Sequence, residues 1–284
     1  MKYATAKAFR QALETKLRQE ESTQSIQKQR KMIAFERFMM RLSDRWILKG
    51  GYALQLRTDS ARTTQDIDLL VQDTTPEEIE YLLRKELEKD LGDFFEFFVE
   101  PNNQLGEMIQ AIRFRITARL DSREFERFHI DIGYQDTVND DLVRLMPSNY
   151  LSFAKVFSKP ILCYPVSQHL AEKIHAIVLP RPNISSRTKD MIDILLLANI
   201  ETNLSCKHIR NVIKKVFEDR KTPLPGSFDN IPRSWRSKYQ DFAKQSQLLF
   251  ADFNEAVEKL NAFINPVLDD TGKGIWNPRH WQWE

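Results

Sequence analysis

The sequence is poor in the residues that cross-link small secreted folds or build zinc sites. It contains two cysteines and five histidines among 284 residues. Cys163 and Cys206 are too few for a disulfide framework, show no metal-ligand spacing and fit a reducing compartment. Among the histidines, His169 and His175 lie near each other in sequence, but residues six apart cannot share one face of a helix. Neither a disulfide-stapled domain nor a histidine-based metal site is indicated.

A surplus of one charge sign is also missing, as are long hydrophobic runs. Lys and Arg total 42 and Asp and Glu total 40, which leaves a formal net charge of +2. Composition alone therefore does not indicate a nucleic-acid binder, and any RNA-binding surface must be local. No apolar run approaches about 18 residues, and charged residues begin at Lys2, without a secretory pattern. We expect a soluble protein of the cytoplasm with no membrane association.

Hydrophobic periodicity changes along the chain and predicts its organisation. Amphipathic helices are expected over residues 4–20 and 25–42, where they wrap the core. Strand patterns then dominate, and from Pro165 onward only helical patterns follow, over 167–179, 186–199, 206–219, 234–248 and 252–267, with a break at 223–226. We predict an α+β fold with N-terminal helices over 1–44, an α+β module over 45–155 and a helical C-terminal module over 156–284.

Four strands are expected in the α+β module, over residues 66–71, 93–99, 107–120 and 125–134. A helix start is predicted at Thr75, because Thr precedes Pro76 and two acids. Residues 121–124 form a plausible turn, so the last two strands should pair as a hairpin. Asp131 interrupts the apolar pattern of the last strand. It must either point to the opposite face or be held by a cation, because buried carboxylates are almost never unpaired.

The most informative stretch is a glycine pair followed by two spaced carboxylates. Gly50 and Gly51 open a helix, whose bare backbone N–H groups and dipole favour phosphate. Asp66 and Asp68 lie two apart on a strand and so project from one face, opposite Ile67 and the apolar residues that follow. Oxygen ligands beside a phosphate-binding turn suit Mg²⁺ and nucleotide chemistry. The alternative is an Asp-x-Asp pair on a solvated strand edge.

Charged residues of the helical module add to this set. Lys173 lies on the flank of an apolar stripe, from which it can reach a cleft, although a surface lysine along the helix is the alternative. Asp190 and Asp193 share a face with Ile194 on the next helix, and the favourable helix dipole is the structural alternative for Asp190.

These residues, in order, resemble the AbiEii/AbiGii class of nucleotidyltransferase toxins, known from abortive infection and toxin–antitoxin pairs. The resemblance covers residues 48–197. The matching motifs are a Lys-Gly-Gly turn, an Arg-x-Thr-x-Asp-x-Asp strand, a downstream helical lysine and an Arg-x-Lys-Asp helix start. In this chain they are Lys49-Gly50-Gly51, Arg62 with Thr64, Asp66 and Asp68, then Lys173, then Arg187 with Lys189 and Asp190. The resemblance implies a polymerase-β-like nucleotidyltransferase fold with a mixed sheet.

The resemblance also implies roles. Asp66 and Asp68 would hold Mg²⁺ against the β and γ phosphates, Gly50 and Gly51 would cradle the triphosphate, and Lys173 would neutralise phosphate charge. Asp190 would complete the site, and Asp131 would be a third metal carboxylate that helps to activate the attacking hydroxyl. The remaining residues implied to bind nucleotide are Lys49, Arg62, Thr64, Arg187 and Lys189. Tyr52 is a departure, because this fold often has a small hydroxylated residue after the glycine pair.

The sequence therefore predicts a Mg²⁺-dependent nucleotidyltransferase toxin that uses an NTP. The family points to the tRNA 3′ end as acceptor, although a protein acceptor stays open, and to a cognate antitoxin. The alternative is a non-catalytic nucleotide-binding or protein-interaction module that keeps the fold. The retained carboxylates argue against it, because their mutual repulsion needs a cation.

Two further features have alternative interpretations. Aromatic and basic residues alternate in the C-terminal tail, which suits either a single-stranded RNA stacking surface or, more simply, a tail that docks by burying its tryptophans. The tryptophans are Trp276, Trp281 and Trp283. The Lys and Arg residues of 207–221 are expected to form a solvated helix face, with tRNA contact as the alternative.

Overall fold

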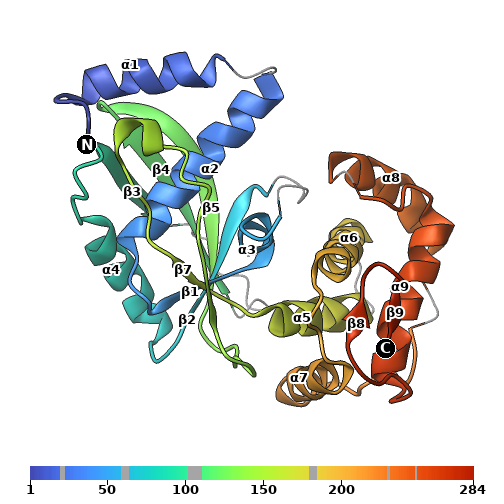
Figure 1. Ribbon diagram of the computed structural model, residues 1–284. Helices are drawn as coiled ribbons and strands as arrows, with labels where there is room; N and C mark the ends of the chain where they lie inside the picture. Colours follow the sequence, from blue (N-terminus) through green and yellow to red (C-terminus); the bar gives the residue numbers. More distant parts are fainter. Residues whose placement is uncertain (20–22, 59–63, 102–110, 179–183, 229–230, 247) are drawn as a thin grey trace. The chain divides into compact units, whose positions relative to one another are not determined.

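The computed structural model describes residues 1–19, 23–58, 64–101, 111–178, 184–228, 231–246 and 248–284 (Figure 1). The chain forms two compact units. The first contains residues 1–56, 64–136 and 144–163, and the second contains 57–63, 137–143 and 164–284. The described residues include nine α-helices and a seven-stranded mixed sheet, so the predicted α+β fold class is confirmed.

The sheet of the first unit has the strand order β3-β4-β5-β2-β1-β7-β6. The pairs β3–β4, β4–β5 and β1–β2 are antiparallel, whereas β2 with β5 and β1 with β7 run parallel. The strands are β1 (Trp46–Lys49), β2 (Asp66–Val71), β3 (Phe95–Pro101), β4 (Ala111–Leu120), β5 (Arg123–Gly133), β6 (Val143–Leu145) and β7 (Ile161–Cys163). The three-residue strands β6 and β7 were not predicted, because runs so short have no detectable periodicity.

One face of this sheet is apolar and packs against α2 (Thr23–Arg41). Phe128 of β5 makes edge contacts with Phe35 and Phe38 of α2, with ring centroids 4.8 and 5.6 Å apart. Ile130 and Ile132 continue the same buried face, since alternate residues of a strand share one side. Asp131 and His129 therefore lie on the opposite face. The first unit also contains α1 (Ala6–Leu17), α3 (Gly50–Gln55), α4 (Pro76–Leu87) and the short 3-10 helix Ser152–Ala154.

The predicted start of α4 is confirmed, and the predicted hairpin is present with a shorter turn. The α4 helix begins at Pro76, and the Glu78 carboxylate accepts the Thr75 N–H at 3.2 Å. The hairpin turn is tighter than predicted. Asp121 and Ser122 make it alone, with φ values of 55° and 57°, and Arg123 already pairs with Leu120. Two left-handed residues match the twist of the flanking strands, so a turn of two residues is sufficient. Residues 107–110 of the expected strand lie outside the described residues.

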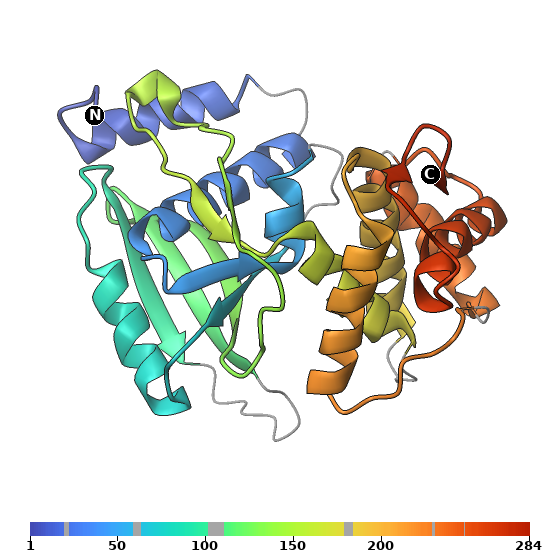
Figure 2. The same cartoon turned by 60° about the horizontal axis from the view of Figure 1, so that its bottom comes forward.

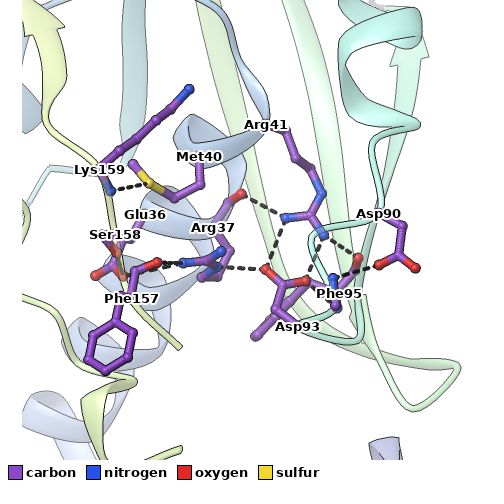
Figure 3. Close-up of polar contacts among 11 residues, drawn as sticks. Glu36, Arg37, Met40, Arg41, Asp90, Asp93, Phe95, Phe157, Ser158 and Lys159 are labelled. Atoms are coloured by element: carbon purple, nitrogen blue, oxygen red, sulfur yellow. Dashed lines mark hydrogen bonds and ion pairs between the residues drawn. The ribbon is translucent and has the colours of Figure 1, made fainter. Parts of the chain in front are cut away.

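A buried ionic network ties α2 to the start of β3 (Figure 3). Arg41 donates to both oxygens of Asp93, at 3.2 and 2.8 Å, and Arg37 donates to one of them at 2.7 Å. All three side chains are at most 3% exposed. Despite burial, which alone would raise it, the pKa of Asp93 is held below its ordinary value by the two guanidinium groups. On the same helix, Glu36 accepts a hydrogen bond from Ser158.

The second unit is helical, as predicted. It contains α5 (Val166–Val178), α6 (Ile184–Ile200), α7 (Cys206–Asp219), α8 (Arg236–Gln245) and α9 (Phe253–Leu268). Each corresponds to one of the five predicted helices, and residues 221–228, which contain the predicted break, include no helix. The α7 helix begins after Ser205, whose side chain accepts the His208 N–H. A short 3-10 helix, Arg233–Trp235, precedes α8.

The C-terminal tail folds back on α9 as a hairpin of β8 (Trp276–Asn277) and β9 (Gln282–Trp283), drawn in red in Figure 2. Trp276 and Trp281 are 1% and 7% exposed. The indole N–H groups of Trp276, Trp281 and Trp283 donate to the carbonyls of Ala198, Lys259 and Phe263. The prediction of a docked tail is confirmed. Among the described residues, no helix is both long and apolar enough to cross a membrane.

Candidate active site

A line of charged residues crosses four strands of the first unit. The register pairs Lys49 of β1 with Asp68 of β2, Asp68 with Asp131 of β5, and Asp131 with Arg113 of β4. Directly paired residues point to the same face of a sheet. Lys49, Asp68, Asp131 and Arg113 therefore form one row, which we call the first charged row, on the face opposite the apolar core.

A second charged row lies two residues along the strands. Asp66 pairs with His129, His129 with Arg115, and Arg115 with Glu100 of β3. His129 Nδ1 lies 3.7 Å from Asp66 Oδ1, and both side chains are 37% exposed. Asp66 and Asp68 thus share a face, as the alternation predicts, while Ile67 and Leu69 are fully buried on the other.

Gly50 lies directly against the Asp68 carboxylate. Its φ of +65° is in the left-handed region, and a β-carbon built on it would fall 1.9 Å from Asp68 Oδ2. Any other residue at position 50 would be strained and would also displace the carboxylate. The glycine pair and the Asp-x-Asp strand, 16 residues apart in sequence, therefore meet in the fold.

Lys49, at the end of β1, forms an ion pair with Asp136. Gly133, where β5 ends, provides the space, since a β-carbon there would lie 3.2 Å from both the Lys49 Nζ and an Asp136 carboxylate oxygen. The lysine implied to bind nucleotide thus has a defined position next to Asp68.

Asp131 faces away from the apolar core and is held by the Arg113 guanidinium, so both alternatives predicted for this carboxylate are found. Arg113 donates from Nε and Nη2 to the two carboxylate oxygens of Asp131, each at 2.6 Å. This pairing, with the fields of Asp66 and Asp68, raises the pKa of Arg113. Within the described residues, no three carboxylate, histidine or cysteine side chains converge as a metal-binding group. The structure therefore places Asp131 beside Asp68 in register, but bound to Arg113.

The other predicted residues of this unit have local contacts. The Thr64 side chain is buried, and its hydroxyl donates to the Asp66 carbonyl at 3.1 Å, where β2 begins. Tyr52 is 2% exposed and its ring packs against Phe35 at 5.2 Å. Burial raises the pKa of Tyr52 well above its ordinary value. The ring at the position after the glycine pair thus belongs to the core. Arg62 lies outside the described residues.

The predicted residues of the second unit form their own cluster. Lys173 Nζ lies 2.7 Å from Asp193 Oδ2 and 3.2 Å from Asp190 Oδ1, and Arg187 pairs with Asp190 at 2.8 Å. Asp193 is fully buried, whereas the Lys173, Asp190 and Arg187 side chains are 11%, 18% and 14% exposed. Lys173 is therefore held by two acids and is not a freely moving surface lysine.

Lys189 has a different neighbour. Its ammonium lies over the Phe242 ring of α8, 5.5 Å from the centroid. The structure thus brings together three of the four predicted residues of this unit, Lys173, Arg187 and Asp190. The fourth, Lys189, instead directs its ammonium at a ring of α8. Asp193, which shares the helix face with Asp190, joins the cluster.

Four residues of the charged rows were not singled out from sequence as members of the site, namely Arg113, His129, Arg115 and Glu100. Arg113 and His129 both flank a predicted carboxylate. The signal for Arg113 was present, since the predicted hairpin turn, if tightened to two residues, pairs position 113 with position 131 after one bulge. His129 lies two residues before Asp131 and so shares its face.

The sequence of residues 37–261 matches the family described as "Nucleotidyl transferase AbiEii toxin, Type IV TA system". The chain belongs to this family. The toxin is accordingly an NTP-dependent nucleotidyltransferase of a toxin–antitoxin system, with a nucleotide as substrate and an antitoxin as partner. This favours an enzyme over the non-catalytic alternative. A comparison of this AbiEii-family toxin with curated proteins gives no match.

The toxin is similar to several solved structures. MenT4, a nucleotidyltransferase toxin from Mycobacterium tuberculosis H37Rv, superposes with a TM-score of 0.53 at 13% identity, over 92% of this chain and 94% of that chain. Two Helicobacter pylori proteins match with TM-scores of 0.48 and 0.42. The first has 13% identity over 88% of this chain and 98% of its own, and the second, JHP933, has 12% identity over 86% and 99%. The likeness to MenT4 supports the nucleotidyltransferase fold.

Proposed function

We propose that this AbiEii-family toxin transfers a nucleotidyl group from a Mg²⁺-bound NTP to the 3′ end of tRNA. The observation that carries the proposal is the contact between Gly50 and Asp68 on a face shared with Asp66. Two carboxylates set against a glycine turn can bind a metal ion next to backbone N–H groups that suit the phosphates of a triphosphate.

The residues fit a hard divalent cation. Asp66 and Asp68 supply carboxylate oxygens, the ligands that Mg²⁺ prefers, and nucleotide phosphates supply others. When bound, Mg²⁺ would neutralise charge on the phosphates and polarise the reacting phosphoryl group. Asp131, next to Asp68 in register, is proposed as the third carboxylate.

In the proposed reaction, an acceptor hydroxyl attacks the α-phosphorus, the bond to the bridging oxygen breaks and pyrophosphate leaves. The hydroxyl proton would pass to solvent, and Asp131 would help to activate the attacking hydroxyl. Gly50 and Gly51 support the triphosphate through backbone N–H groups, assisted by Lys49, Arg62 and Thr64. Lys173, Asp190, Arg187 and Lys189 are also proposed as nucleotide-binding residues, on the basis of the family motifs that they match. Such transfer depends mainly on positioning and charge stabilisation, which these residues provide.

The test combines purified toxin, total tRNA and each of the four NTPs labelled at the α-phosphate, with Mg²⁺ or with EDTA. We expect label at the tRNA 3′ end with one or more NTPs, loss of label in EDTA, and loss with Asp68→Asn. Label that persists in EDTA would contradict the metal role. Label on protein instead of tRNA would contradict the proposed acceptor while keeping the transfer.

A further inference from the structure

Arg113 binds the carboxylate of Asp131, which the proposed reaction requires. Its guanidinium engages both oxygens of Asp131, each at 2.6 Å, in a planar two-point contact. Such forks are the strongest geometry for an arginine–carboxylate pair. While the fork is closed, the Asp131 oxygens are directed at β4 and not at a cation shared with Asp68.

The Arg113–Asp131 pair is open to solvent, so another cation can reach Asp131 and replace Arg113. The Arg113 side chain is 45% exposed and that of Asp131 is 26% exposed. Ion pairs at such exposure contribute about 0–1 kcal/mol, and the bidentate geometry places this pair at the upper end of that range. A divalent cation carries twice the charge of the guanidinium, so a cation bound by Asp66 and Asp68 can compete with Arg113 for the Asp131 carboxylate.

We infer that Arg113 is an internal counter-ion that keeps Asp131 out of the metal set until a divalent cation displaces it. Arg113 is then a positioning residue that acts through Asp131 and sets the cation concentration at which the site assembles. The inference rests on the proposed function, because it takes Asp66, Asp68 and Asp131 as the cation ligands.

The experiment measures Mn²⁺ binding to the intact toxin without NTP, from loss of the free-ion signal in electron paramagnetic resonance. Arg113→Gln removes the fork, and we expect its Mn²⁺ dissociation constant to fall about fivefold, the ratio that corresponds to about 1 kcal/mol. Arg113→Lys keeps the charge without the planar fork and should lie between the two. Adding Asp131→Asn to Arg113→Gln should return the affinity to that of the wild type or weaker.

Arg115→Gln is the matched control. Arg115 lies two residues along β4 on the same face, is 49% exposed and pairs with Glu100 at 3.7 Å, so its loss removes the same charge without touching Asp131. We expect this variant to bind Mn²⁺ less than twofold more tightly than the wild type. Equal gains in Arg113→Gln and Arg115→Gln would overturn the inference, because a general charge effect would then explain both.

The outcomes separate the inference from the proposed function. If wild-type toxin binds Mn²⁺, loses it with Asp68→Asn and is unchanged by Arg113→Gln, the inference fails and the metal site stands. If neither the wild type nor Arg113→Gln binds Mn²⁺, the metal role of the carboxylates fails, and the inference fails with it.

Discussion

The carboxylate of Asp68 lies where a side chain on Gly50 would have to begin. A β-carbon at position 50 would be 1.9 Å from Asp68 Oδ2 and 2.5 Å from its Cγ, and the glycine has a φ of +65°. The absence of a side chain at one residue thus decides where the carboxylate of another can lie. This relationship makes the glycine pair and the Asp-x-Asp strand parts of one site.

Gly50→Ala should move Asp68 and strongly reduce transfer without unfolding the protein. We expect activity to fall by roughly 10²–10³, as when a preorganised electrostatic contact is lost. The overpacked site should also destabilise the fold by about 1–3 kcal/mol. Labelled-NTP transfer and thermal unfolding measure the two effects.

Gly92→Ala provides the control for backbone strain. Gly92 has nearly the same φ, +63°, but no atom lies within 4 Å of the added β-carbon. It should lose some stability and keep full activity. If Gly50→Ala were as active as Gly92→Ala, the packing of residue 50 on Asp68 would have no role in transfer.

Asp66→Asn should remove activity while leaving stability equal or slightly higher in the absence of metal. Its side chain is 37% exposed, so little packing is lost, and removing one of two neighbouring like charges relieves repulsion. Denaturant unfolding in EDTA and the transfer assay measure this. A variant that transfers at the wild-type rate would refute the role of the two carboxylates.

Lys173→Ala should cost stability as well as activity, because its partner Asp193 is fully buried. Removing one member of a buried pair leaves the other charge poorly compensated, and we expect a loss of about 2–4 kcal/mol in the free energy of unfolding. Lys173→Ala combined with Asp193→Asn should recover most of the stability and none of the activity. Recovery of transfer in the double variant would show that Lys173 acts only through the fold.

Glu36→Gln should make the stability of the first unit less dependent on pH. Burial is the largest cause that raises the pKa of Glu36 above 4.5, opposed by Ser158, Arg37 and the backbone at Tyr150. The unfolded chain therefore releases this proton at lower pH than the folded chain, and stability falls as pH rises from about 4.5 through the raised folded value. The variant carries no such proton and should lack this decline.

Denaturant unfolding of the wild type and Glu36→Gln at several pH values from 5 to 8 measures the difference. Asp93 has the opposite sign, since its lowered pKa stabilises the fold above 3.8, and it stays ionised throughout this range. A difference between the two proteins that does not change with pH would contradict the assignment to Glu36.

Local sequence patterns predicted most helices and strands, and they placed Asp66 and Asp68 on one face of a strand. Alternation along β2 is enough to place Asp66 and Asp68 opposite Ile67, because the period of two is a property of any strand. The start of α4 at Pro76 likewise follows from the residues next to it. The three-residue strands β6 and β7 carry no such pattern, and their place in the sheet depends on β1 and its neighbours.

The sequence by itself determined which residues could carry nucleotide chemistry and on which side of a strand they project, because side-chain chemistry and strand alternation are local. Only the tertiary structure decided their partners. The pairing of β2 with β5 and of β5 with β4 sets Asp131 between Asp68 and Arg113. The turn at Lys49 brings Gly50 against Asp68, and the packing of α5 with α6 gives Lys173 two acids. Each contact joins segments distant in sequence. It therefore depends on strand register and helix packing, which are set by the whole core and not by local sequence.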